Sequence, residues 1–186
     1  FLHQKCNKYF CIIVAIKYKK SSALGAMRFR FLAIFTKLLK TSALTSGRQD
    51  SIVSSFISWA SPNLPEFTRL SSTDKKKLDG GNVKNSTKYI LKALKKYHTK
   101  ITFFIVGQIF EWYPELIDQI AKDGHEIAYH THEHEIITDK QVLIKSLIKS
   151  KKFIEKYKPV GFRAPRISID TECLSVLKNY GFKYDS

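Results

Sequence analysis

A largely apolar run, Ile-Thr-Phe-Phe-Ile-Val at 101–106, is the feature that most constrains the fold of this chain. A strand that is apolar at consecutive positions has to be covered on both faces, as strands are in parallel sheets flanked by helices. From residue 51 onward, short apolar runs alternate with amphipathic helical patterns, the order expected of parallel strands joined by helices. The sequence therefore predicts an α/β domain over residues 51–186, with 101–106 as a central strand.

The other expected elements follow from periodicity and from cap residues. We predict strands near 51–57, 125–129, 160–163 and 182–185, and helices over 83–97, 109–122, 139–157 and 170–180. Asp139 is a candidate N-cap, and Gly124 suits the left-handed position that follows a helix. The apolar residues expected to face the core from the first and third of these helices are Ile90, Leu91, Leu94, Tyr97, Val142, Leu143, Leu147, Ile148 and Ile154.

Residues 1–50 differ from the rest of the chain in composition. They carry ten Lys or Arg and one acid, Asp50, with neither clean periodicity nor helix caps. We expect a poorly ordered basic extension that does not belong to the domain. Its composition fits an organelle transit segment, or an extension that arises from an unprocessed or mistranslated sequence.

The formal net charge of +16 raises the question of a nucleic-acid partner. Much of the excess lies in residues 1–50, and lysines later in the chain recur on one helix face, which is typical of a solvated surface. We therefore expect no nucleic-acid partner. No run approaches the roughly 18 apolar residues of a membrane-spanning helix, so no transmembrane segment is expected. The three cysteines, an odd number, argue against a disulfide framework and favour a reducing, cytoplasmic compartment.

Three histidines fall within five residues, His-Thr-His-Glu-His at 130–134, directly after the expected strand at 125–129. Neutral imidazole is a common ligand of divalent metals. On one helical turn His130 and His134 would share a face, whereas in an extended segment His132 would join them. We prefer the pair, and ligand sites in parallel α/β folds gather at this end of the strands. The alternative is a surface cluster that holds no metal.

Six segments share their order and spacing with a known family. They are Ile-Thr-Phe-Phe-Ile-Val-Gly at 101–107, Tyr-Pro-Glu-Leu at 113–116, Gly-His-Glu-Ile at 124–127, His-Thr-x-x-His at 130–134, Gly-Phe-Arg-Ala-Pro at 161–165 and the closing segment 180–186. On these segments the chain resembles the polysaccharide deacetylases, the NodB-homology group of carbohydrate esterases. The resemblance implies an incomplete NodB-like distorted (β/α) barrel with parallel strands, truncated at the C-terminus.

The resemblance also implies a divalent metal cofactor. His130 and His134 would be its ligands, Thr131 would brace their loop by hydrogen bonding, and His132 would be a bystander. Zinc is the first expectation, with cobalt, nickel and iron as alternatives, since imidazole and carboxylate donors suit all four.

The Arg-x-Pro motif of the family falls on Arg163 and Pro165. There the arginine orients the catalytic carboxylate, and Arg166 would offer its backbone N–H to the oxyanion. Arg166 departs from the aromatic residue that is commoner in the family, which puts substrate stacking in doubt and leaves the backbone role intact. An arginine can hold a carboxylate with two hydrogen bonds. The alternative for Arg163 is a surface ion pair.

The implied activity is metal-dependent hydrolysis that removes N-acetyl groups from an amino-sugar polysaccharide or glycan, so a carbohydrate is the expected partner. The family carries an Asp-Asp or Asp-x-Glu pair on its first strand, but Ser-Ser-Phe-Ile-Ser-Trp at 54–59 holds no acid. Without that carboxylate we expect weak metal binding. The resemblance implies that the general acid is a histidine of a later motif, which would lie beyond Ser186. The alternative is a catalytically impaired fragment or noncatalytic relative that only binds sugar.

Overall fold

The computed structural model describes residues 13–15 and 69–185. The predicted strand at 51–57 and the acid-free segment 54–59 lie outside the described residues, as does most of the predicted N-terminal extension. In chain order the elements are β1 (Ile13–Ala15), α4 (Ser72–Asp79), α5 (Asn82–Lys96), β2 (Thr102–Ile105), α6 (Gly107–Trp112), α7 (Pro114–Lys122), β3 (Glu126–Tyr129), α8 (Lys140–Lys149), α9 (Lys151–Tyr157), β4 (Gly161–Phe162), the 3-10 helix η1 (Pro165–Ile167), α10 (Thr171–Asn179) and β5 (Tyr184–Asp185).

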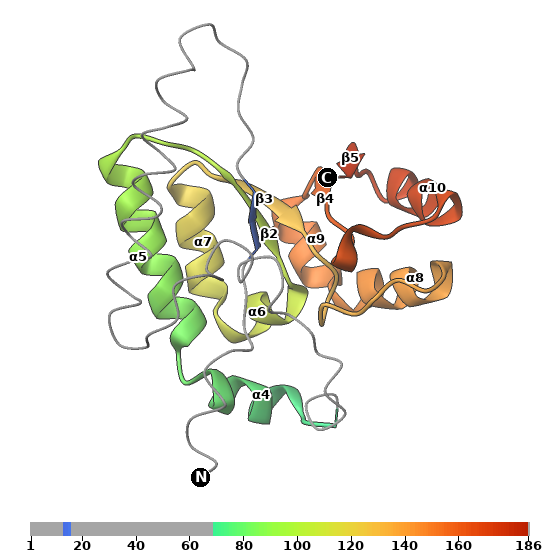
Figure 1. Ribbon diagram of the computed structural model, residues 1–186, viewed down its shortest axis with the longest axis horizontal. Helices are drawn as coiled ribbons and strands as arrows, with labels where there is room; N and C mark the ends of the chain where they lie inside the picture. Colours follow the sequence, from blue (N-terminus) through green and yellow to red (C-terminus); the bar gives the residue numbers. More distant parts are fainter. Residues whose placement is uncertain (1–12, 16–68, 186) are drawn as a thin grey trace, which may run out of the picture.

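The strands form one sheet in the order β1-β2-β3-β4-β5 (Figure 1). The pairs from β2 to β5 are all parallel, with Ile105 opposite Tyr129 and Tyr129 opposite Phe162. Ile13–Ala15, a short part of the N-terminal segment, pairs antiparallel with β2. The predicted α/β class with a parallel sheet is confirmed.

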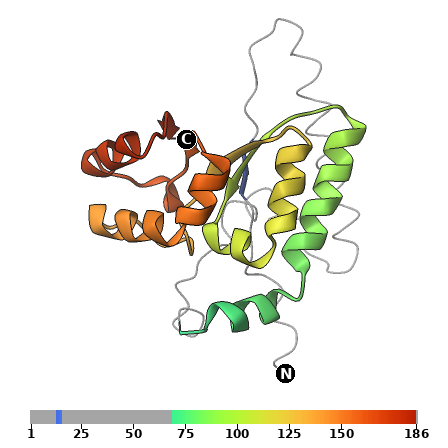
Figure 2. The same cartoon turned by 180° about the vertical axis from the view of Figure 1, so that it is seen from behind.

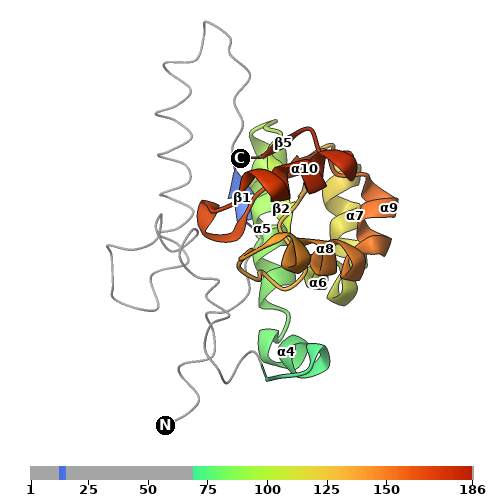
Figure 3. The ribbon, with the colours of Figure 1, turned by 90° about the vertical axis from the view of Figure 1, so that its right-hand side faces the viewer.

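The helices α5, α7 and α9 cover one face of this sheet, as seen from behind in Figure 2. Figure 3 shows α7 and α9 together to one side of β2. Phe103 and Ile105 of β2 point into the core on that face, while Phe104 points to the opposite face and packs with Ala128 and Tyr184. All three β2 residues are fully buried, which confirms a central strand covered on both faces.

Two of the predicted helices are each divided into two. The helix predicted over 109–122 is α6 followed by α7, because Pro114 at the start of α7 disfavours a helical conformation at Tyr113. The helix predicted over 139–157 is α8 followed by α9, with a local break at Ser150. The break is mild, since the Ser150 N–H still donates to the Ser146 carbonyl oxygen at 3.0 Å.

The predicted caps and most of the predicted core positions are confirmed. The Asp139 carboxylate accepts hydrogen bonds from the backbone of Gln141 and Val142, and Gly124 has a φ of +78°. Two core positions were predicted wrongly: Ile148 is 61% exposed and Tyr97 is 39% exposed. Ile148 falls just outside the inward stripe of α8, which is made of Leu143, Ser146, Leu147 and the following Ser150.

No helix within the described residues is long and apolar enough to cross a membrane.

On the face of the sheet opposite α7, Tyr184 crosses directly over a glycine. Its hydroxyl donates to the Glu126 carboxylate at 2.5 Å, and the Thr102 hydroxyl donates to the other carboxylate oxygen at 2.6 Å. A Cβ atom at Gly161 would overlap the Tyr184 ring and hydroxyl. Gly161 therefore leaves the space through which the tyrosine reaches Glu126.

We predict that Gly161→Ala destabilises the fold by about 1–3 kcal/mol, the usual range for overpacking a buried position. The measurement is the free energy of unfolding in urea. In a Tyr184→Ala background the same change should cost much less, because the overlapping ring is gone. An equal cost in both backgrounds would contradict the assigned cause.

Candidate functional site

The three clustered histidines lie in a loop that directly follows β3, in neither of the conformations expected from the sequence. Thr131 and His134 have φ values of +59° and +61°, so the segment is neither a helical turn nor an extended strand. The chain curls, and the rings of His130 and His134 meet with their centroids 4.7 Å apart and their planes at 66°. His132 makes its contacts elsewhere, with Ser150 and Glu111.

The buried ring of His130 is held in one tautomer. Its Nδ1 lies 2.7 Å from the Arg163 carbonyl oxygen, which can only accept, so Nδ1 carries the proton and Nε2 keeps its lone pair. Within residues 13–15 and 69–185, neither Nε2 of His130 nor Nδ1 of His134 has a hydrogen-bond partner, although both are buried. Buried polar atoms without partners are uncommon, and a ligating histidine typically donates its other N–H to a carbonyl. The pair therefore fits two of the donors that a divalent metal needs.

Electrostatics favours the neutral form of both rings. Burial, followed by the neighbouring His134, lowers the pKa of His130 to about 3. Burial also lowers the pKa of His134, and the charge of Arg166 contributes in the same direction. The neutral ring is the form that can ligate a metal.

A third ligand is not found in the part of the chain that the structure describes, where no three His, Cys, Asp or Glu side chains gather into a metal-binding group. Asp79 is buried, and its carboxylate accepts from Tyr113 Oη at 2.6 Å and from the Val83 N–H in the first turn of α5 at 3.0 Å, so it is already engaged. Glu133 lies in the histidine loop, but its carboxylate accepts from Lys149 at 2.8 Å and from Lys75 at 3.4 Å. These contacts engage the carboxylate of Glu133 away from the ring pair.

Arg163, predicted to orient a carboxylate, follows β4 beside the histidine loop. Its backbone N–H donates to the Tyr129 carbonyl oxygen at 3.0 Å, and its guanidinium carbon lies 4.5 Å from the centre of the Phe104 ring. Burial lowers the pKa of Arg163, while Asp185 and Tyr184 act in the opposite direction. The main chain of Arg163 thus fixes His130 while its side chain remains half-buried between aromatic and acidic neighbours.

The two remaining predicted site residues lie in η1. Pro165 is buried and opens this turn, whereas Arg166 is exposed and has a φ of +58°. The charge of Arg166 acts on the pKa of His134, so the sequence motif and the histidine loop are electrostatic neighbours. The roles of Arg163, Pro165 and Arg166 in catalysis stay predictions.

The hydrogen bond expected from Thr131 is absent among the described residues, where its buried hydroxyl has no partner. The loop is held by other groups, which the sequence analysis did not single out. The backbone N–H groups of Gly107 and Gln108 donate to the carbonyls of Thr131 and His132 at 2.9 and 2.8 Å. Ser146 accepts from the His132 N–H at 2.8 Å. The signal available in the sequence was the pair of serines four residues apart in the inward stripe of α8.

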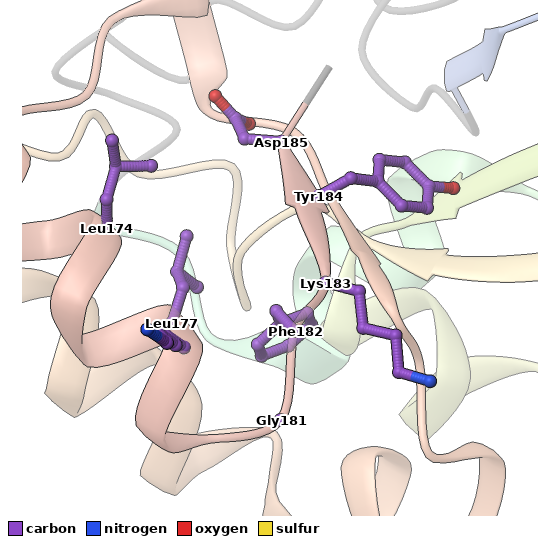
Figure 4. Close-up of a pocket in the computed structure, with 8 residues that line it drawn as sticks. Leu174, Leu177, Gly181, Phe182, Lys183, Tyr184 and Asp185 are labelled. Carbon is purple, nitrogen blue, oxygen red and sulfur yellow. The ribbon is translucent and has the colours of Figure 1, made fainter.

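A separate cavity of about 610 Å³ lies between α10 and β5 (Figure 4). Leu174, Leu177 and Phe182 supply its apolar lining, and Tyr184 points away from the two leucines (Figure 4). Neither His130 nor His134 lines this cavity. The histidine pair and the cavity are therefore distinct features.

We predict that the metal-free protein loses stability as the pH falls below about 6.5, because the unfolded chain then binds a proton that the buried His130 does not. The contribution of His130 to the free energy of unfolding is complete above pH 6.5. It declines as the pH falls, until the pKa of His130 in the folded state, about 3, is reached. His130 alone should contribute a slope of about 1.4 kcal/mol per pH unit within this window.

Urea unfolding at several pH values between 5 and 7.5, with a chelator present, measures this slope. His130→Asn should reduce it, and His98→Asn at an exposed position is the control. Identical slopes for wild type and His130→Asn would show that His130 is not the source.

This chain is similar to proteins of a known family. A family model described as polysaccharide deacetylase matches residues 77–184, more than half of the chain. The chain is 28% identical over 132 residues to a peptidoglycan-N-acetylglucosamine deacetylase of Bacillus cereus, covering 69% of this chain and 59% of that protein. It is 33% identical over 105 residues to the peptidoglycan-N-acetylmuramic acid deacetylase PdaC of Bacillus subtilis, covering 54% and 22%.

The fold also has a counterpart among solved structures. A family 4 carbohydrate esterase from Streptomyces lividans, solved in complex with acetate, matches with a TM-score of 0.50 and 24% identity, over 54% of each chain. The chain thus spans 59% or less of the length of each of these three proteins. The match over residues 77–184 includes the histidine loop and the Arg-x-Pro turn, and the chain belongs to the polysaccharide deacetylase family.

Proposed function

We propose that this chain takes part in removing N-acetyl groups from an amino-sugar polysaccharide, with His130 and His134 as two ligands of a divalent metal. The observation that carries the proposal is the pair of rings in contact after β3, each with a buried nitrogen that has no hydrogen-bond partner among the described residues. The names of the relatives, which refer to peptidoglycan sugars, support an N-acetylated cell-wall glycan as the substrate class. Zinc is the first candidate metal, with cobalt, nickel and iron as alternatives.

When bound, the metal would polarise the acetamide carbonyl and activate a water molecule. The protein residues around it have separate tasks. The Arg163 carbonyl holds the proton of His130 on Nδ1 and so keeps Nε2 available as a donor. The guanidinium of Arg163 would orient a carboxylate base, which segment 54–59 does not hold, and the backbone N–H of Arg166 would stabilise the oxyanion of the tetrahedral intermediate.

A second candidate function is binding of the polysaccharide without hydrolysis. The sequence observation that favours it is the segment 54–59, which holds no carboxylate where the family supplies a metal ligand and a general base. Two imidazoles alone bind a divalent metal less tightly than three or four ligands do, and hydrolysis needs a base. Acetate release separates the two candidates.

We predict that His130→Asn and His134→Asn each abolish binding of Co²⁺ over the concentration range that saturates the wild-type chain. Asparagine is chosen because it tolerates the positive φ at His134 and removes the imidazole donor. The visible absorption of bound Co²⁺ reports occupancy directly. His98→Asn, at an exposed histidine that also has positive φ, is the matched control. Wild-type binding by either loop variant would contradict the ligand assignment.

We further predict that Ser55→Asp and Ile57→Glu, which together create an Asp-x-Glu pair in segment 54–59, tighten Co²⁺ binding and raise acetate release from N-acetylglucosamine oligomers. A positioned general base contributes about 10²–10⁴-fold to the rate of such reactions. Metal binding without acetate release, in both the wild-type chain and this double variant, would favour the noncatalytic candidate. Unchanged metal affinity would show that the segment does not supply a ligand.

A further inference from the structure

We propose that His132, Ser146 and Ser150 form a buried hydrogen-bonded brace that positions the His130 and His134 rings for metal binding. This inference rests on the proposed function of the ring pair. It assigns a role to His132, the histidine between the two candidate ligands, which the family resemblance leaves as a bystander.

His132 is attached to α8 through both its main chain and its ring. Its side chain is buried, with 6% of the residue exposed. The His132 N–H donates to Ser146 Oγ at 2.8 Å, and its ring Nδ1 lies 3.0 Å from Ser150 Oγ. Both serines are themselves buried, so these bonds are shielded from competing water. The middle of the loop is therefore fixed at two points on α8.

The two serines are in turn held by the aromatic core. The Tyr129 hydroxyl lies 2.8 Å from Ser146 Oγ and 2.9 Å from Ser150 Oγ. Tyr129 is fully buried at the end of β3, and its ring packs against Phe153 and Phe182 at centroid distances of 5.8 and 6.0 Å. A continuous chain of contacts thus runs from the core through the serines to His132.

The start of α6 closes the brace from the other side. The Gly107 N–H donates to the Thr131 carbonyl oxygen at 2.9 Å. A Cβ atom at Gly107 would overlap Ser150 Oγ and would lie 2.8 Å from Nδ1 of His132. The His132 ring therefore fills a space in which it has little freedom to move.

The brace has a consequence for the flanking residues. Thr131 and His134 adopt positive φ, which is unfavourable for residues other than glycine. Fixing His132 towards α8 offsets this cost and leaves the rings of His130 and His134 in contact with each other. The hydroxyl of Thr131 has no hydrogen-bond partner in residues 69–185, so the side chain of Thr131 adds no hydrogen bond that fixes the loop.

The test is the Co²⁺ affinity of variants of the full chain, measured by titration with visible absorption and compared with the melting temperature of each metal-free protein. Ser150→Ala and His132→Ala should each weaken Co²⁺ binding by about 10–100-fold, the usual effect of removing a residue that positions a metal ligand. His132→Asn should recover much of the affinity, because its side-chain amide can take the place of Nδ1. The absorption bands of the bound Co²⁺ should change in the alanine variants.

Tyr113→Phe is the control for a purely structural role. It removes a buried 2.6 Å hydrogen bond to Asp79, outside the histidine loop, and should lower the melting temperature without changing Co²⁺ affinity. Wild-type affinity in Ser150→Ala and His132→Ala overturns the inference, as does a loss of affinity in Tyr113→Phe that matches theirs at equal loss of stability. If Ser150→Ala does not fold, His132→Ala against His132→Asn decides.

Failure of the proposed function gives a different pattern. In that case the wild-type chain and His130→Asn bind Co²⁺ equally, and both the ligand assignment and the brace are overturned together. If His130→Asn loses binding while the brace variants keep it, the ring pair stands and only the brace is wrong.

Discussion

The parallel pairing of β3 with β2 on one side and β4 on the other is the constraint on which the rest of this structure depends. Ile105, Tyr129 and Phe162 lie in register across the three strands. The ladder continues past the strand ends, with the His130 N–H donating to Ile105 and the Arg163 N–H donating to Tyr129. Because parallel strands end at the same edge of a sheet, the histidine loop and the Arg-x-Pro turn become neighbours there.

The strands β2 to β5 and the helical regions that form α5 to α10 could be predicted because the information is local, whereas β1 and α4 were not predicted. A consecutive apolar run such as 101–106 reports burial on both faces, and Asp139 reports a helix start through its own side chain. The break at Pro114 could have been predicted by the same reasoning, since proline restricts the residue before it. The break at Ser150 could not be predicted, because the Ser150 hydroxyl makes hydrogen bonds with Tyr129 and His132, which lie on other elements.

The location of the candidate site was predictable, whereas the conformation of its loop was not. The rings of His130 and His134 do meet, but the loop that brings them together needs positive φ at Thr131 and His134, which no residue type there signals. Spacing arguments assume a regular helix or strand, and this loop is neither. Ser146 is a polar residue in an otherwise apolar stripe, and it marks the surface of α8 to which the loop attaches.

The crossing of Tyr184 over Gly161 has a consequence for how related sequences can diverge. Neither position can change alone without cost: a side chain at 161 meets the tyrosine ring, and loss of the tyrosine leaves Glu126 without its phenol donor. Neutral drift at the two sites should therefore be correlated, with a larger residue at 161 accompanied by a smaller one at 184. In homologues, this pair would record the contact between β4 and β5 even where the intervening helix has changed beyond recognition.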